Sequence, residues 1–182
     1  MSQAWQFGLV GILAVALVTD LKARKIYNWL TFPGLAAGLA LSTGLGGLAG
    51  LQGSLGGLLA ASAVFLLLFL LPQSSMGAGD VKLMAVVGAW LGWPAALAAV
   101  VYVSFAGGVV ALAQAARYGT LKLLFRNVYW IFVGLLVPGG KASGAVTRSA
   151  TPPVPYGVAI VAGACLALLY PEPQHLFDLV RR

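Results

Sequence analysis

The sequence predicts an all-α polytopic membrane protein with about six transmembrane helices. Hydrophobic residues make up 60% of its 182 residues and charged residues only 8%, which is far from the composition of a soluble protein. The charges are confined to short stretches, because four long segments contain none: residues 1–19, 26–79, 83–116 and 149–171. Since one crossing needs roughly 20 residues, we expect residues 1–182 to form a single membrane domain.

Turn-forming residues divide the apolar stretches into six segments, at about residues 5–19, 29–50, 55–71, 81–93, 95–116 and 155–170. The fourth and fifth segments are separated at Gly92-Trp93-Pro94, because proline interrupts helical hydrogen bonding and an unbroken helix there would reach roughly 54 Å. The fourth segment is therefore short, at about 13 residues or roughly 20 Å.

Residues 121–137 combine Lys122 and Arg126 with Leu, Phe, Tyr and Trp, which favours an in-plane helix at the membrane interface. A seventh crossing is the alternative, but only residues 127–137 of this stretch are free of charge. With the N-terminus outside and six crossings, nine of the eleven Lys and Arg residues lie on the cytoplasmic side, in agreement with the positive-inside rule. The net charge of +7 is therefore expected to serve topology and contacts with anionic lipids rather than nucleic acid.

Cysteine and histidine are too scarce to predict a disulfide framework or a metal site. Cys165 is the only cysteine and lies in an apolar run, and His175 is the only histidine. We therefore expect no metal and no other cofactor. The first apolar segment lacks a preceding basic region, so we expect it to be a retained helix rather than a secretory signal.

Acidic residues are the most informative feature, because residues 1–171 contain only Asp20 and Asp80. A carboxylate in or near hydrocarbon is costly and marks a functional site by default. Asp20 ends the first segment and Asp80 begins the fourth, so the two crossings between them place both residues on the cytoplasmic face. Because the fourth segment is short, we expect Asp80 to lie roughly 10 Å below that surface, buried in protein or lining a wet cavity.

Two carboxylates that face each other share a proton, since like charges at short range cannot both ionise easily. The ionised partner can take a proton from water while the protonated partner polarises a carbonyl, as in aspartic proteases. Helix position favours the anion at Asp80, which starts a helix, over Asp20, which ends one. The glycines before Asp80, Gly77 and Gly79, permit positive φ and the close approach of another backbone.

Each aspartate also has a simpler explanation, since Asp80 could cap the fourth helix and Asp20 could be solvated beside Lys22 and Arg24. A proton-coupled transporter that uses both aspartates as relay sites is the main alternative function. It predicts an inverted repeat with paired broken helices, whereas the sequence contains one clear break and no convincing repeat. A third alternative is a non-catalytic assembly protein that packs through its glycine pairs.

Three ordered motifs resemble those of the prepilin peptidase family. Gly77-Ala78-Gly79-Asp80-Val81-Lys82-Leu83 matches the GxGD signature of these intramembrane aspartic proteases. Thr19-Asp20-Leu21, followed by Lys25-Ile26-Tyr27-Asn28, resembles the first aspartate motif of the family. Pro155-Tyr156-Gly157 resembles its last-helix motif, so the likeness extends over nearly the whole chain.

The resemblance implies an aspartic endopeptidase of the inner (plasma) membrane, with Asp20 and Asp80 as the catalytic pair on the cytoplasmic side. Its partners would be membrane lipids and prepilin substrates, whose short cytoplasmic leader is cut next to the hydrophobic helix, typically after glycine. Lys82 belongs to the matching motif, where it either holds the loop at the surface or neutralises part of the charge of the pair.

The sequence departs from the family pattern in two places. Tyr27 stands where the family usually has proline, which predicts a looser turn after Asp20. Longer family members also carry paired CxxC motifs and a methyltransferase activity, and this sequence has no such motif. It therefore resembles the short form associated with tight-adherence (Flp-type) pili, or an archaeal preflagellin-type relative.

Overall fold

The computed structural model describes residues 3–70, 76–136 and 156–170, and the regular structure within these ranges is helical. The helices are α1 (Gln3–Ala23), α2 (Asn28–Leu70), α3 (Ala78–Leu91), α4 (Ala95–Arg117), α5 (Leu121–Leu136) and α7 (Tyr156–Leu169). Three of them, α1, α2 and α4, are long and apolar enough to cross a membrane. The prediction of an all-helical membrane protein is confirmed at this level.

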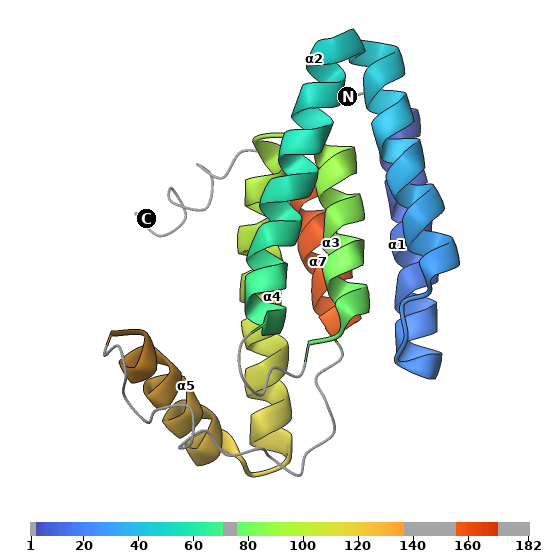
Figure 1. Cartoon of the computed structure of the whole chain (residues 1–182). Coiled ribbons are helices and arrows are strands. Elements are labelled where there is room, and N and C mark those ends of the chain that lie inside the picture. Colours follow the sequence, from blue (N-terminus) through green and yellow to red (C-terminus); the bar gives the residue numbers. More distant parts are fainter. Residues whose placement is uncertain (1–2, 71–75, 137–155, 171–182) are drawn as a thin grey trace.

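The long helix α2 folds back on itself at Gly47, where φ is 58° and ψ is −143°. Glycine reaches this conformation at little cost because it lacks a Cβ. Figure 1 shows one leg of α2 beside α1 and the other beside α3 and α4. The second and third predicted segments are therefore two legs of one element. The bend lies at Gly47 rather than in residues 51–54, where the sequence predicts it. Several glycines in this stretch could form a bend, and the packing of the two legs against other helices decides which of them does.

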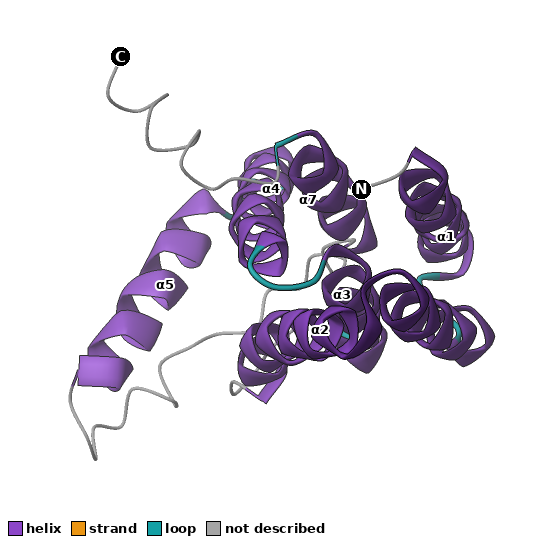
Figure 2. Cartoon of the chain, turned by 90° about the horizontal axis from the view of Figure 1, so that it is seen from above, coloured by secondary structure: helices purple, strands orange, loops and turns teal. Residues whose placement is uncertain are grey.

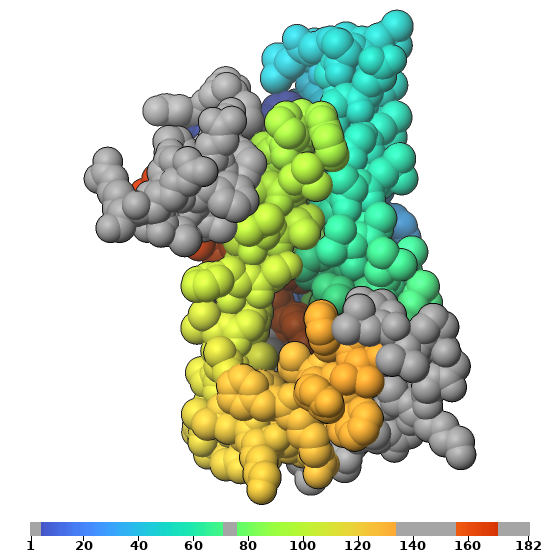
Figure 3. Space-filling model, turned by 90° about the vertical axis from the view of Figure 1, so that its left-hand side faces the viewer, coloured from blue at the N-terminus to red at the C-terminus, as the bar shows by residue number. Residues whose placement is uncertain are grey.

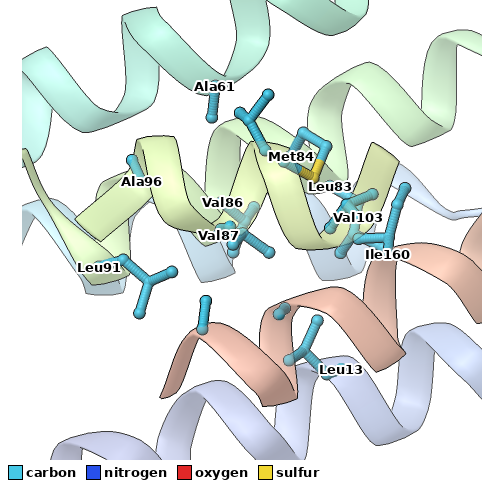
Figure 4. Close-up of a cluster of buried hydrophobic side chains, with 14 of the residues drawn as sticks. Leu13, Ala61, Leu83, Met84, Val86, Val87, Leu91, Ala96, Val103 and Ile160 are labelled. Atoms are coloured by element: carbon cyan, nitrogen blue, oxygen red, sulfur yellow. The ribbon is translucent and has the colours of Figure 1, made fainter. Parts of the chain in front are cut away.

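The short helix α3 lies at the centre of the bundle and is buried from Leu83 to Leu91 except for Ala85 (Figure 2). Apolar side chains from α1, α2, α4 and α7 pack around it, as Figure 4 shows for Leu13, Ala61, Val103 and Ile160. The second leg of α2 approaches α3 backbone to backbone, because a Cβ built on Gly57 would collide with the Gly88 carbonyl oxygen. A helix that is apolar all round is expected at such a central position.

Trp90 connects α3 to both α1 and α2. Its indole N–H donates a hydrogen bond to the Gly34 carbonyl oxygen at 2.7 Å, and its own carbonyl oxygen accepts one from the Trp5 indole at 2.9 Å. The two indole rings also meet edge to face, with 5.5 Å between their centroids. This cluster joins the three helices at the end of α3 that lies far from Asp80.

Replacing Trp90 with Phe is expected to lower the free energy of unfolding by about 1–2 kcal/mol, because a buried hydrogen bond and part of a packed ring are lost. Denaturant or thermal unfolding in detergent measures this loss. Trp93→Phe is the matched control, since Trp93 is 57% exposed and should tolerate the change. Equal losses in the two variants would contradict the structural role of Trp90.

The break after α3 lies where the sequence predicts it, whereas the helix begins earlier than predicted. The helix ends at Leu91 and α4 begins at Ala95, so the break at Gly92-Trp93-Pro94 is confirmed. At the other end α3 begins at Ala78 instead of about residue 81, which places Asp80 inside the first turn rather than at the very start of the helix. The extra turn forms because the side chain of Asp80 satisfies an amide at the start of the helix, as described below.

Helix α5 leaves the end of α4 and extends away from the bundle (Figures 1 and 2). Phe125, Val128, Tyr129 and Phe132 are spaced to lie on one face of this helix, and all four are more than half exposed. The amphipathic character predicted for this stretch is therefore present, with an apolar face that the described part of the chain leaves uncovered.

Candidate active site

Asp20 and Asp80 lie at the same end of the bundle. Asp20 lies near the end of α1 and Asp80 in the first turn of α3, and each is only 8% exposed. Within the described ranges, the other buried polar side chains are Thr31 and Ser54. The start of α3, which carries Asp80, packs against the connection that follows Asp20, since a Cβ on Gly79 would lie 3.0 Å from the Ile26 Cβ. The fold thus brings together the two acids that the sequence singled out.

The carboxyl group of Asp80 is held by the glycine that precedes its helix. Its Oδ2 atom accepts a hydrogen bond from the Gly77 N–H at 2.9 Å, and the Asp80 N–H donates to the Gly77 carbonyl oxygen at 3.1 Å. Gly77 is the N-cap of α3 and Asp80 is the third residue of the helix. The side chain therefore satisfies an amide at the helix start and is fixed against its own backbone.

The carboxyl group of Asp20 is held by a different helix. Its Oδ2 atom accepts a hydrogen bond from the N–H of Gly157, the second residue of α7, at 3.1 Å in a buried setting. Asp20 lies in the last turn of α1, but its carboxyl group contacts the start of α7. Both carboxyl groups contact the amide-rich beginning of a helix, so the difference in charge preference expected from helix position is not supported.

Gly157 is the site residue that the sequence did not single out. A Cβ built on it would lie 2.7 Å from Cγ and 2.9 Å from Cβ of Asp20, so only glycine lets the carboxyl group reach this amide without a shift. The available signal was its place in the Pro155-Tyr156-Gly157 motif at the start of the last helix. Sequence alone gave that glycine no partner, because Asp20 is remote in the chain.

The two glycines of the expected substrate-approach loop differ in their surroundings. A Cβ on Gly79 would lie 3.0 Å from the Ile26 Cβ and 3.4 Å from the Ile26 carbonyl oxygen, whereas Gly77 is exposed and has room for one. Neither glycine has a positive φ, so that part of the expectation is wrong. Close backbone approach does occur at Gly79, where the start of α3 packs against the connection between α1 and α2.

Lys82 points to the start of α2. Its Nζ donates a hydrogen bond to Asn28 Oδ1 at 2.8 Å and lies 5.5 Å from the centroid of the Phe32 ring. Asn28 begins α2, and Phe32 follows one turn later on the same face of that helix. Lys82 therefore connects the helix that carries Asp80 to the element that follows Asp20.

In the described part of the chain, no group of three or more His, Cys, Asp or Glu side chains is placed to hold a metal. The chemistry available to the site is that of two buried carboxyl groups, one able to accept a proton while the other donates one. His175 lies outside the described residues.

Comparison with known proteins identifies the family. A model described as the type IV leader peptidase family matches residues 7–112, a range that includes Asp20, Asp80 and Lys82. The chain belongs to this family. Two curated relatives from Burkholderia pseudomallei, strains 1026b and K96243, are both described as prepilin leader peptidase/N-methyltransferase. Each is 33% identical to the chain over 111 residues.

The match covers 58% of this chain but only 36% of each of these relatives. No solved structure matches the chain. Membership of the type IV leader peptidase family agrees with the resemblance found in the sequence motifs. Helix α7 and Gly157 lie beyond the range of the family model, so their place at Asp20 comes from the fold alone.

Proposed function

We propose that the chain is an aspartic endopeptidase that removes the short leader of type IV pilin-like precursors of the Flp type, typically after glycine. The observation that carries this proposal is that Asp20 and Asp80, two buried carboxyl groups on separate helices, lie at the same end of the bundle in a chain of the leader peptidase family. The proposal covers the peptidase reaction alone and not the methyl transfer named for the relatives.

The arrangement supports direct attack by water. The ionised carboxylate takes a proton from water, whose oxygen attacks the scissile carbonyl carbon, while the protonated carboxyl group donates a hydrogen bond to the carbonyl oxygen. The tetrahedral intermediate collapses when the C–N bond breaks and the leaving nitrogen takes up a proton. The products are a new carboxylate on the leader and a new amine on the mature protein.

The hydrogen bonds of the two side chains suit this division of work. Gly77 and Gly157 each occupy the Oδ2 atom of one aspartate. Oδ1 of each aspartate is the atom that we propose serves water or substrate. The two amides thus fix the orientation of the carboxyl groups before substrate arrives, which lowers the cost of reaching the transition state.

We further propose six crossings of the inner membrane, formed by α1, the two legs of α2, α3, α4 and α7, with the aspartates at the cytoplasmic end. In the described ranges every Lys and Arg lies in α5 or at the end of the bundle that holds the aspartates: Lys22, Arg24, Lys25, Lys82, Arg117, Lys122 and Arg126. This distribution is typical of a cytoplasmic face. Helices α3 and α7 have 14 residues each, fewer than the roughly 20 of a full crossing, so their ends at the site are recessed.

Helix α5 is assigned to the cytoplasmic membrane interface. Its exposed apolar face carries Phe125 and Phe132, while Lys122 and Arg126 can reach anionic head groups. Figure 3 shows α5 below a hollow between α4 and the second leg of α2, at the bottom of which α7 is visible. An interfacial α5 would lie next to the place where a membrane-anchored substrate enters.

The proposed reaction is tested by incubating membranes that contain the full chain with an Flp-type pilin precursor and identifying the products by mass spectrometry. We expect one cut next to the hydrophobic segment, after the glycine that ends the leader. A precursor in which that glycine is replaced by a bulky residue is the matched control. An intact Flp-type precursor, or cutting elsewhere in the chain, would contradict the proposal.

Gly79→Ala is expected to slow cleavage by about threefold to tenfold, because its methyl group would press on Ile26 and shift the first turn of α3. Cleavage rates at saturating substrate measure the effect. Ile26→Ala in the same chain should restore much of the rate, since it provides the missing space. If Gly79→Ala has no effect, or if the second change restores nothing, the contact with Ile26 does not set the position of Asp80.

A further inference from the structure

We propose that Lys82 is a positioning residue, which fixes the separation of the two aspartates by tying the start of α3 to the start of α2 through Asn28 and Phe32. The inference deepens the proposed function and rests on it. It chooses between the two roles that the sequence left open for this lysine, namely holding the loop and neutralising the charge of the pair.

The ammonium group of Lys82 contacts two side chains of α2. Nζ of Lys82 lies 2.8 Å from Asn28 Oδ1 and 5.5 Å from the Phe32 ring centroid. Both partners belong to the first turns of α2, and a charged donor makes a stronger hydrogen bond than a neutral one. Among the described residues, the ammonium group thus contacts an amide and an aromatic ring rather than a carboxylate.

Asn28 and Phe32 follow directly after the short connection that joins α1 to α2. Arg24 donates its backbone N–H to the Asp20 carbonyl oxygen at 2.8 Å, and the short connection from Arg24 leads directly to Asn28. Lys82 therefore contacts the end of the α1–α2 connection that is farther from Asp20. Gly79 touches the middle of the same connection at Ile26. The two contacts lie on either side of Asp80 in the sequence.

The far end of the bundle holds α1 and α3 together by a different contact. There, α1 and α3 are joined by the hydrogen bond from the Trp5 indole to the Trp90 carbonyl oxygen. No hydrogen bond between α1 and α3 is present near the aspartates within the described residues. The relative position of Asp20 and Asp80 is therefore set through α7 on one side and through the α1–α2 connection on the other, where Lys82 provides the polar link.

The experiment compares steady-state cleavage by Lys82→Met, Asn28→Ala and the double variant. We expect each single change to lower kcat by about tenfold to a hundredfold with little change in KM, and the double variant to be no worse than either. Lys82→Arg should retain most of the rate, because it keeps the charge, the donors and the contact with Phe32.

Lys22→Met is the matched control for charge, because Lys22 follows Asp20 by two residues as Lys82 follows Asp80. Lys22 is exposed and has no partner among the described residues. If Lys22→Met lowers kcat as much as Lys82→Met, or if Asn28→Ala has no effect while Lys82→Met shifts the pH profile, Lys82 acts through its charge and the positioning role is wrong.

A measurement without activity separates this inference from the proposed function. In a Cys165→Ala background, cysteines placed at positions 20 and 80 report by disulfide formation how often the two sites meet. We expect Lys82→Met to slow this cross-linking severalfold and Lys82→Arg to leave it nearly unchanged. Equal rates in all three chains would overturn the positioning role even if cleavage is confirmed, whereas a slower rate would support it even if cleavage is not found.

Discussion

Asp20→Asn and Asp80→Asn are each expected to lower the rate of precursor cleavage by about 10³-fold or more. Asparagine has nearly the shape of aspartate but cannot take a proton from water or donate one to a leaving group. Its amide oxygen can still accept the hydrogen bond from Gly77 or Gly157, so the fold should persist. Product formation in membranes, together with helical content and elution of the purified variants, measures both properties.

The double variant gives a sharper version of the same test. If the two carboxyl groups act as a unit, removing the second after the first should cost little more, because the shared proton transfer is already lost. Independent contributions would instead multiply to a far larger loss. Asp178→Asn is the matched control for the substitution itself, since Asp178 is the only other aspartate of the chain and lies outside the described residues.

Two other outcomes would redirect the interpretation. If both single variants still cleave within about threefold of the wild-type rate, the pair is not catalytic, since loss of an acid–base group costs about 10²-fold or more. If the wild-type chain does not cleave but moves protons across vesicles in a manner that depends on Asp20 and Asp80, the relay alternative is supported. If both variants fail to fold, the aspartates have a structural role, which they perform through their hydrogen bonds to the amides at the starts of α3 and α7.

The sequence correctly predicted that Asp20 and Asp80 lie at the same end of the bundle, because this depends only on the number of segments between them. Sparse charge located the apolar segments, and the number of segments between Asp20 and Asp80 decided which end of the bundle each reaches. Proline at position 94 likewise ends a helix for a local reason. Features that depend on the number of apolar segments, or on the backbone of a single residue, can therefore be predicted from the sequence.

Features that depend on contacts between remote segments could not be predicted from the sequence. Several glycines near residue 47 could have formed the bend of α2, and packing of its two legs selects one of them. The partner of Lys82 is a residue of another helix. The carboxyl group of Asp20 is directed to α7, so helix position in α1 alone gave the wrong electrostatic expectation.

Gly157→Ala is expected to lower kcat by about a hundredfold, although the substitution adds only a methyl group outside the pair itself. That methyl group would collide with the carboxyl group of Asp20, with 2.7 Å to its Cγ atom. Asp20 must then turn away from the amide that holds it, which changes the position of its carboxyl group at the site. The new methyl group displaces the Asp20 carboxyl group but does not block substrate binding. KM should therefore change much less than kcat.

The rest of α7 provides the control that decides how Gly157 acts. A Cβ on Gly163 would collide with the Val103 backbone, so Gly163→Ala disturbs the packing of α7 on α4 at a point away from Asp20. Gly108→Ala on α4 meets nothing within 4 Å and should be harmless. The free energy of unfolding is measured for each variant and compared with its kcat. If Gly163→Ala loses as much activity as Gly157→Ala at equal stability, displacement of α7 is the cause. If only Gly157→Ala loses activity, α7 contributes the backbone amide that orients one half of the proposed catalytic pair.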